Sequence, residues 1–138
     1  MSDVRAMLVG KVNDVWTRRI ETISSDSLGE GEVLIAVEYS CINYKDGLST
    51  TEKGKVARID PLIPGVDLAG TVVESSDPSV AVGSQVIAHG NDIGVAHHGG
   101  FATMARVPAR WIVPMPKGLT TKTAMMVGTA GFTAAMSV

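Results

Sequence analysis

Two short stretches, SCINYKD at residues 40–46 and IPGVDLAG at residues 63–70, carry the most informative pattern in this chain. In the first, an apolar strand ends in a dense set of polar side chains. In the second, a Pro-Gly turn opens another strand with an acid, Asp67, at its start. Polar groups gathered at strand ends on an apolar scaffold are a common way to present chemistry to a small ligand. We therefore expect the chemistry of this chain at these strand ends.

Composition narrows the class of protein. The 138 residues are 45% hydrophobic and carry a formal charge of −2, which is typical of one globular domain. The absence of a basic run argues against a nucleic-acid partner. A single cysteine excludes an internal disulfide, and no signal peptide or membrane-spanning run is visible. These features indicate a cytoplasmic protein.

Residues 1–107 alternate between short apolar runs and turns rich in Gly, Pro, Asp and Ser. This pattern predicts a mainly β fold with short helices, in the form of a barrel or sandwich. The expected strands cover residues 4–9, 15–20, 33–41, 69–74, 82–88, 100–107 and 111–113.

A helix is expected after Pro116. Residues 119–123 are typical of a helix N-cap region, and residues 124–127 begin a helix-favouring run. Gly128 and Gly131 weaken that helix, which would make sense if another group must approach its backbone closely. The chain stops at Val138 in the middle of an apolar segment, so we expect it to be a fragment.

Four motifs resemble those of a known family, in the same order. They are the segment 43–46, the turn 63–70, the pair Gly99-Gly100, and residues 128–134. Together they are similar to the medium-chain dehydrogenase/reductase superfamily, in its zinc-free quinone-oxidoreductase branch. Within that branch the chain resembles the bacterial acrylyl-CoA reductase group, which uses NADPH to reduce activated C=C bonds.

The resemblance implies a two-domain oxidoreductase. Residues 1–123 would form the GroES-like, partly open β-barrel on the substrate side, and residues 124–138 would begin the helix leading to a Rossmann domain. No G-x-G-x-x-G follows a strand in this chain, so the main NADPH-binding surface is expected to be missing. We expect the 138 residues alone to be catalytically inactive.

The resemblance also implies a metal-free mechanism. Zinc-dependent relatives have cysteine at the position of Asn43 and histidine at the position of Val66, and neither residue present here is a usual zinc ligand. Their four-cysteine structural lobe is also absent, since Cys41 is the only cysteine. No metal site is therefore expected.

Asn43 and Tyr44 are the candidate catalytic residues. The Asn43 amide could bind a nicotinamide or substrate carbonyl as donor or acceptor, or it could simply cap a turn. Tyr44 could stack on the nicotinamide or donate a proton after hydride transfer, or it could complete the barrel end as a half-buried aromatic.

Three charged residues of the same motifs have weaker claims. Lys45 could neutralise a cofactor phosphate or polarise a thioester oxygen, although a solvated lysine is the default. Asp46 and Asp67 could act on a proton, but acids in such turns more often accept backbone hydrogen bonds and pair with a cation. Asp67 could then order the site from behind the reacting groups.

Thr129 and the histidines complete the candidates. The Thr129 hydroxyl could reach a cofactor carboxamide, or bond a carbonyl one turn back. His97 and His98 lie on a Gly-rich loop with His89 and are expected to cover the substrate, with one of the pair near the thioester. A histidine metal site is disfavoured because adjacent residues of a strand point to opposite faces. Cys41 is expected to be a small buried hydrophobe.

The rival hypothesis is a non-enzymatic GroES-like barrel that binds a ligand or another chain. The apolar residues 124–138 could also pair between two copies, which would give a homodimer. Acceptors other than acrylyl-CoA, including other enoyl thioesters and quinones, remain open at this point, as does the choice between NADPH and NADH.

Overall fold

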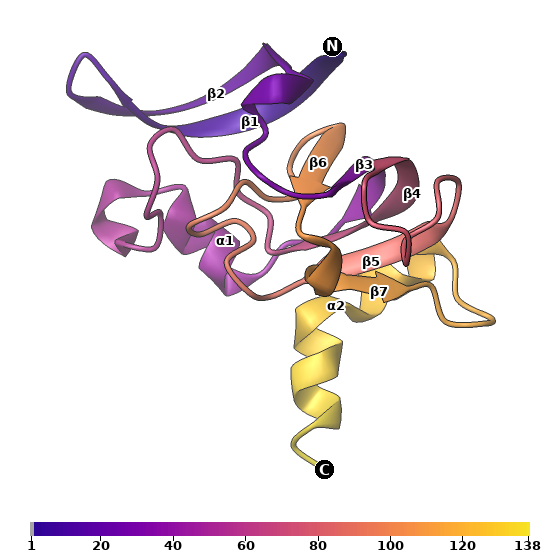
Figure 1. Ribbon diagram of the computed structural model, residues 1–138. Coiled ribbons are helices and arrows are strands. Elements are labelled where there is room, and N and C mark those ends of the chain that lie inside the picture. The colour runs from indigo at the N-terminus through magenta and orange to yellow at the C-terminus, as the bar shows by residue number, and fades with distance from the viewer. Residues whose placement is uncertain (1) are drawn as a thin grey trace.

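The computed structural model describes residues 2–138, which form an N-terminal hairpin, an open sheet and two helices (Figure 1). The strands are β1 (Asp3–Val12), β2 (Val15–Ser24), β3 (Val33–Ser40), β4 (Asp67–Ser75), β5 (Gln85–His89), β6 (Met104–Val107) and β7 (Ile112–Pro114). The helices are α1 (Tyr44–Ser49) and α2 (Thr121–Ala135), with single 3-10 turns at Ser25–Ser27, Glu52–Gly54 and Ala109–Trp111.

Five strands form one antiparallel sheet in the order β6-β3-β4-β5-β7. The predicted mainly β architecture with short helices is confirmed, and the sheet remains open rather than closing into a barrel. The expected strands all appear, within a few residues of their predicted ends. The strict alternation expected along residues 33–41 is broken, because β3 shifts register against β4 after Leu34 and after Val37.

The hairpin β1–β2 forms a second sheet above the first (Figure 1). It is tied down through β1: the amide of Met7 donates to the carbonyl of Phe101, and Val9 exchanges two backbone bonds with Leu62. Between the two sheets lies an apolar cluster that includes Val4, Leu8, Leu28, Leu34 and Ile63, all buried. A separate apolar cluster is built mainly from strands of the five-stranded sheet and includes Val33, Ile35, Leu68, Val86 and Val107.

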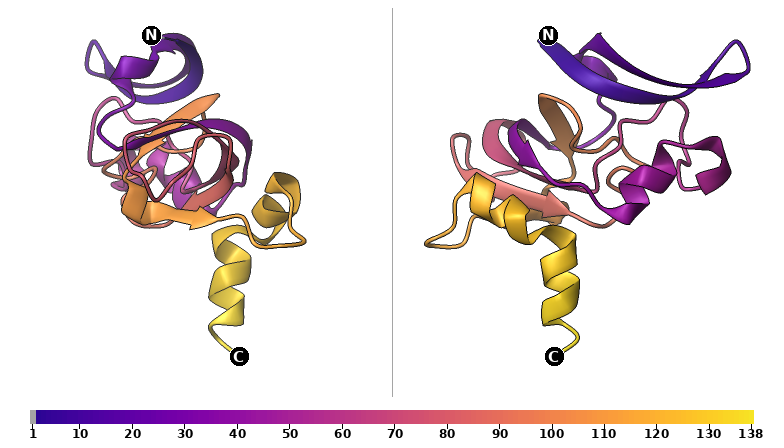
Figure 2. Two further views of the ribbon diagram at one scale, coloured as in Figure 1. Left: turned by 45° about the vertical axis from the view of Figure 1, so that its right-hand side comes forward. Right: turned by 180° about the vertical axis from the view of Figure 1, so that it is seen from behind.

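Helix α2 begins as expected, with a capping threonine. The Thr120 hydroxyl accepts from the amide of Thr123, and Thr121 donates to Glu38 on β3. Its first turns pack on the sheet through Ala124 and Met125, against Ala69 and Cys41. The helix then breaks, and its second half runs away from the sheet toward the C-terminus (Figure 2).

The break lies at Gly128, whose backbone has φ 53° and ψ −165°. Only glycine adopts this backbone conformation without strain, because any larger side chain strongly disfavours it. A Cβ atom there would also lie 2.6 Å from Cys41 Sγ. The close approach of another group, anticipated for Gly128 and Gly131, is therefore found at Gly128, where Cys41 lies against the backbone. The kink at Gly128 changes the direction of the chain just before Thr129.

No helix among residues 2–138 is long and apolar enough to cross a membrane. In the same part of the chain, no three His, Cys, Asp or Glu side chains gather closely enough to hold a metal ion.

Candidate functional site

The candidate site is centred on Asp67, the first residue of β4, whose side chain is fully buried. Its carboxylate accepts from Cys41 Sγ at 2.8 Å, from Asn43 Nδ2 at 2.7 Å, and from the Thr129 amide and hydroxyl at 3.1 and 2.5 Å. The donors come from the end of β3, the start of α1 and the kink of α2. A single acid thus joins three elements that are distant in sequence. We call Asp67, Cys41, Asn43 and Thr129 the Asp67 cluster.

The cluster holds a negative charge without a cation. No described Lys, Arg or His forms an ion pair with Asp67 or with Asp46, so the cation partner expected for these acids is not found. Burial disfavours ionisation of Asp67, but the hydrogen bonds from Cys41, Thr129 and Asn43 outweigh it and hold the pKa of the carboxyl below its ordinary value. Asp67 is therefore ionised at neutral pH.

Cys41 is shaped by the same carboxylate. Burial, followed by the hydrogen bond to Asp67, raises the pKa of the Cys41 thiol from its ordinary value of 9.0 to about 12. The thiol stays protonated and donates to the acid. Cys41 is half-buried and packs beside Ala69 and Met125, but its thiol also donates to Asp67, so the expectation of a small buried hydrophobe is only partly met.

Asn43 is fixed in one orientation by this arrangement. An ionised carboxylate only accepts hydrogen bonds, so the amide nitrogen must face Asp67 and the amide oxygen must face away. The same nitrogen lies 3.7 Å from Cys41 Sγ. Both N–H groups are engaged, and Oδ1 lies on the other side of the amide, toward the first turn of α1, where Asn43 and Asp46 form a capping box. Of the two binding modes considered for Asn43, the structure engages the donor with Asp67, and the capping alternative is also seen, because Asn43 is the N-cap of α1.

Asp46 supports the cluster from the neighbouring turn. Its side chain is 1% exposed and accepts from the amides of Asn43, Gly65 and Val66 at 2.7, 3.1 and 2.9 Å. This bonding joins the start of α1 to the Pro-Gly turn that precedes Asp67. A six-residue helix containing Gly47 has little intrinsic stability, so the Asp46 bonds explain why α1 forms and why local patterns did not predict it.

Tyr44 and Lys45, the next residues after Asn43, point to solvent. Tyr44 is 84% exposed, and its hydroxyl forms no hydrogen bond with the described part of the chain. The half-buried packing considered for Tyr44 is therefore not what the structure has. Both side chains remain available to a ligand that covers the first turn of α1.

The two adjacent histidines lie apart from the Asp67 cluster in the hydrogen-bond network. His98 Nδ1 accepts from the amide of Ile63 at 3.1 Å, and burial together with the neighbouring His97 lowers the pKa of His98. His97 Nε2 lies 2.8 Å from the carbonyl of Glu30, and its ring packs edge-on against Trp111. Both thus hold loops together, and a position over a substrate stays a prediction.

Pattern reasoning missed His89 as a neighbour of the site. His89 is the β5 partner of Asp67, and its ring packs edge-on against Phe132 of α2 at 5.1 Å between centroids. Together with Gly128 these residues line an apolar cavity of about 140 Å³. The antiparallel register that places His89 opposite Asp67 is the signal that could have found it.

The cavity is too small to enclose a dinucleotide, since pockets for drug-sized ligands are roughly 300–1,000 Å³. These residues instead form one side of a candidate binding site. It consists of the fixed amide oxygen of Asn43, the buried carboxylate of Asp67 behind it, and the exposed Tyr44 and Lys45 beside it. Such a surface can orient a planar polar group of a ligand whose opposite side is bound by another protein segment.

Comparison with known proteins identifies relatives. The family model described as alcohol dehydrogenase GroES-like domain matches residues 29–117. Over 135 residues the chain is 43% identical to a probable acrylyl-CoA reductase, AcuI, of Escherichia coli, which covers 98% of this chain and 42% of the relative.

Two solved structures show the same fold. The yhdH oxidoreductase of Salmonella enterica, in complex with NADP, has a TM-score of 0.91 at 40% identity and covers 96% of this chain and 41% of its own. The yhfP protein of Bacillus subtilis, with NAD bound, has a TM-score of 0.94 at 47% identity and covers 99% and 42%. The chain thus spans about two fifths of the length of the curated relatives it matches.

Proposed function

Because the chain belongs to the alcohol dehydrogenase GroES-like domain family, we propose that it forms the substrate side of a nicotinamide-dependent reductase of activated C=C bonds. Acrylyl-CoA or a related enoyl thioester is the proposed acceptor, with quinones as the alternative, and NADPH is the proposed reductant. Relatives described as a probable acrylyl-CoA reductase and as an oxidoreductase in complex with NADP support this assignment.

The observation that carries the proposal is the Asp67 cluster. An ionised, buried acid without a cation is costly to maintain, and here hydrogen-bond donors from three elements stabilise it. The result of that arrangement is that the Asn43 amide oxygen faces away from Asp67. An amide oxygen held in this way suits the N–H groups of a carboxamide, which nicotinamide carries.

The chain's own residues then have distinct roles. Asn43 would accept from the carboxamide, and the Thr129 oxygen, whose proton is donated to Asp67, could accept a second bond. When bound, the nicotinamide supplies hydride to the β-carbon of the alkene. Tyr44 and Lys45 would stabilise negative charge on the substrate oxygen, and Tyr44 would return a proton to the α-carbon.

The donor set of the cluster fits such a cofactor and does not fit zinc. The positions that could face a ligand carry an amide oxygen and a hydroxyl, and the one thiol is protonated and turned to Asp67. We propose that the reaction is zinc-independent. We also propose that residues 1–123 form the substrate-side domain and residues 124–138 begin the connection to a nicotinamide-binding domain.

A chimera tests the proposal. This chain would replace the matching first two fifths of the Bacillus subtilis relative, to which it is 47% identical. The chimera should oxidise NADPH or NADH in the presence of acrylyl-CoA, a longer enoyl-CoA or a quinone. If the chimera binds the nicotinamide but turns over with no activated alkene and no quinone, the proposal is rejected in favour of a binding module.

A further inference from the structure

The outer edge of the N-terminal hairpin is a long strand edge without a partner. Strand β1 lies between β2 and the rest of the molecule, because Met7 and Val9 direct their backbone groups to Phe101 and Leu62. Strand β2 pairs only with β1 in the described part of the chain. Ten residues of regular strand therefore present one free edge.

The ladder fixes which backbone groups face outward. Residues of an antiparallel pair alternate between facing their partner strand and facing away from it. Val9 faces Leu62, so its β2 partner Arg18 must face the free edge, whereas Arg19, opposite Leu8, is bonded to β1. The outward set is Trp16, Arg18, Ile20, Thr22 and Ser24. For residues 16, 18, 20 and 22, no backbone bond to any other described residue is found.

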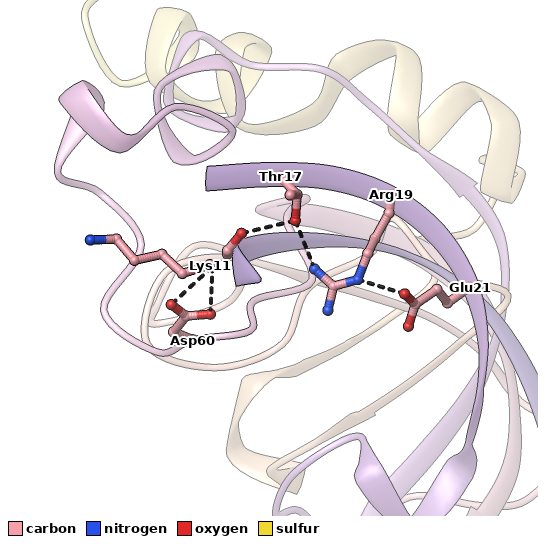
Figure 3. A network of polar contacts seen from close by, with 6 residues as sticks. Lys11, Thr17, Arg19, Glu21 and Asp60 are labelled. Carbon is pink, nitrogen blue, oxygen red and sulfur yellow. Dashed lines mark hydrogen bonds and ion pairs between the residues drawn. The ribbon is translucent and has the colours of Figure 1, made fainter. Parts of the chain in front are cut away.

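The side chains of β2 place charges of opposite sign on the two sides of Ile20, Arg19 before it and Glu21 after it. On one face, Arg19 lies between Thr17 and Glu21 and bonds to both, at 3.0 and 2.6 Å (Figure 3). On the opposite face, Ile20 is 64% exposed. An arginine and a glutamate two residues apart, with an exposed isoleucine between them, is a self-complementary arrangement.

We propose that this edge binds a second copy of the same chain, with two β2 strands antiparallel across a two-fold axis at Ile20. Ile20 then lies opposite the partner's Ile20, and Arg18 lies opposite the partner's Thr22. Arg19 lies opposite the partner's Glu21, and by symmetry this ion pair forms twice. The result is a continuous four-stranded sheet across the dimer.

Charge complementarity selects this register. An axis at Arg18 or Arg19 would place that arginine opposite itself, and an axis at Glu21 would place two carboxylates opposite each other. Like charges directly opposite across strands are destabilising, and opposite charges are stabilising. The register centred on Ile20 joins unlike charges and also buries the two exposed isoleucines together.

Swapping charges tests the pairing without relying on loss of association alone. Arg19→Glu and Glu21→Arg each place like charges across the axis, and each should raise the dimer dissociation constant about tenfold or more. An equimolar mixture of the two variants restores complementary pairs, so it should form a heterodimer of near wild-type affinity. Sedimentation velocity across a concentration series measures all three samples.

The mixture also distinguishes loss of the ion pairs between two chains from loss of the bond within one strand. Each single variant loses the Arg19–Glu21 bond within its own strand, and mixing cannot restore that bond. Recovery of the dimer in the mixture would support edge pairing. A monomeric wild-type chain, or variants that associate as the wild type does, would overturn it.

Amide exchange on the unmodified chain gives an independent test. As concentration rises, the amides of Arg18 and Ile20 should become protected, whereas those of Thr17 and Arg19 are bonded to β1 already and should not change. Association through another surface, such as the exposed Met126 and Phe132 of α2, would leave Arg18 and Ile20 exchanging freely and would refute the proposal.

Discussion

Replacing Gly128 with alanine tests the kink that delivers Thr129 to Asp67. At φ 53° and ψ −165° the backbone occupies a region that is essentially restricted to glycine, and a side chain there costs on the order of 1–3 kcal/mol. The new Cβ would also lie 2.6 Å from Cys41 Sγ and 3.2 Å from Asp67 Oδ2, so the cluster itself must shift.

The backbone strain and the displacement of the Asp67 cluster both lower the free energy of unfolding. Displacing α2 would weaken the two Thr129 bonds to Asp67, each worth on the order of 1.5–3 kcal/mol because the acceptor is charged. The lower flexibility of alanine in the unfolded chain offsets about 0.4–1 kcal/mol. We expect Gly128→Ala to lower the free energy of unfolding by about 2–4 kcal/mol.

Urea denaturation followed by tryptophan fluorescence and circular dichroism measures this change. Gly47→Ala is the matched control, because Gly47 lies in α1 at an ordinary φ and a Cβ there meets nothing within 4 Å. That control should be neutral or stabilising by up to about 1 kcal/mol. If Gly128→Ala is as stable as the control, the kink is not held by the contacts described and the reasoning fails.

Three further predictions concern single groups. At pH 8 the Cys41 thiol should react with a thiol reagent roughly a thousandfold more slowly than an unperturbed cysteine, because its pKa is about 12 rather than 9.0. Asp67→Asn should recover only part of the reaction rate, because burial raises the Cys41 pKa more than the hydrogen bond to Asp67 does. Full recovery of the rate would contradict this ranking of the two causes. The pKa of His98 is lowered in the folded chain from its ordinary value of 6.5. As the pH falls below 6.5, His98 therefore takes up a proton more readily in the unfolded chain than in the folded chain, which favours unfolding. The free energy of unfolding should therefore fall between about pH 7 and 5, and His98→Asn, which keeps an acceptor for Ile63, should flatten that slope in pH-dependent denaturation; an unchanged slope would refute the assignment. Asp46→Asn replaces an acceptor of three amides and should cost about 2–3 kcal/mol of unfolding free energy, whereas a loss below 0.5 kcal/mol would contradict its role in holding α1.

The strands were predictable because their signals are local. Apolar runs between Gly, Pro and Asp turns define β1 to β7, and a threonine-rich segment before an apolar run defines the start of α2. Helix α1 was not predictable in this way. Its stability comes from Asp46 bonding to Gly65 and Val66, which are nineteen and twenty residues away.

The candidate site was predictable in its members but not in its centre. The strand-end motifs named Asn43 and Asp67, the family-like segment 128–134 named Thr129, and the structure brings all three together. Local patterns rank Asp67 as an ordinary turn acid, because nothing near it in sequence shows that three elements donate to it. The same limit hid the bond from Cys41 and the packing of His89 against Phe132.

The most direct measurement is the kcat/KM for NADPH-dependent reduction of acrylyl-CoA by the chimera carrying Asn43→Ala. Removing one well-placed hydrogen bond at a reaction site costs about 1–1.5 kcal/mol, so kcat/KM should fall about tenfold. Gln85→Ala, which removes an exposed amide from β5, should stay within about twofold of the parent chimera. Equal values for the two variants would contradict the claim that Asp67 holds Asn43 in place for the reaction.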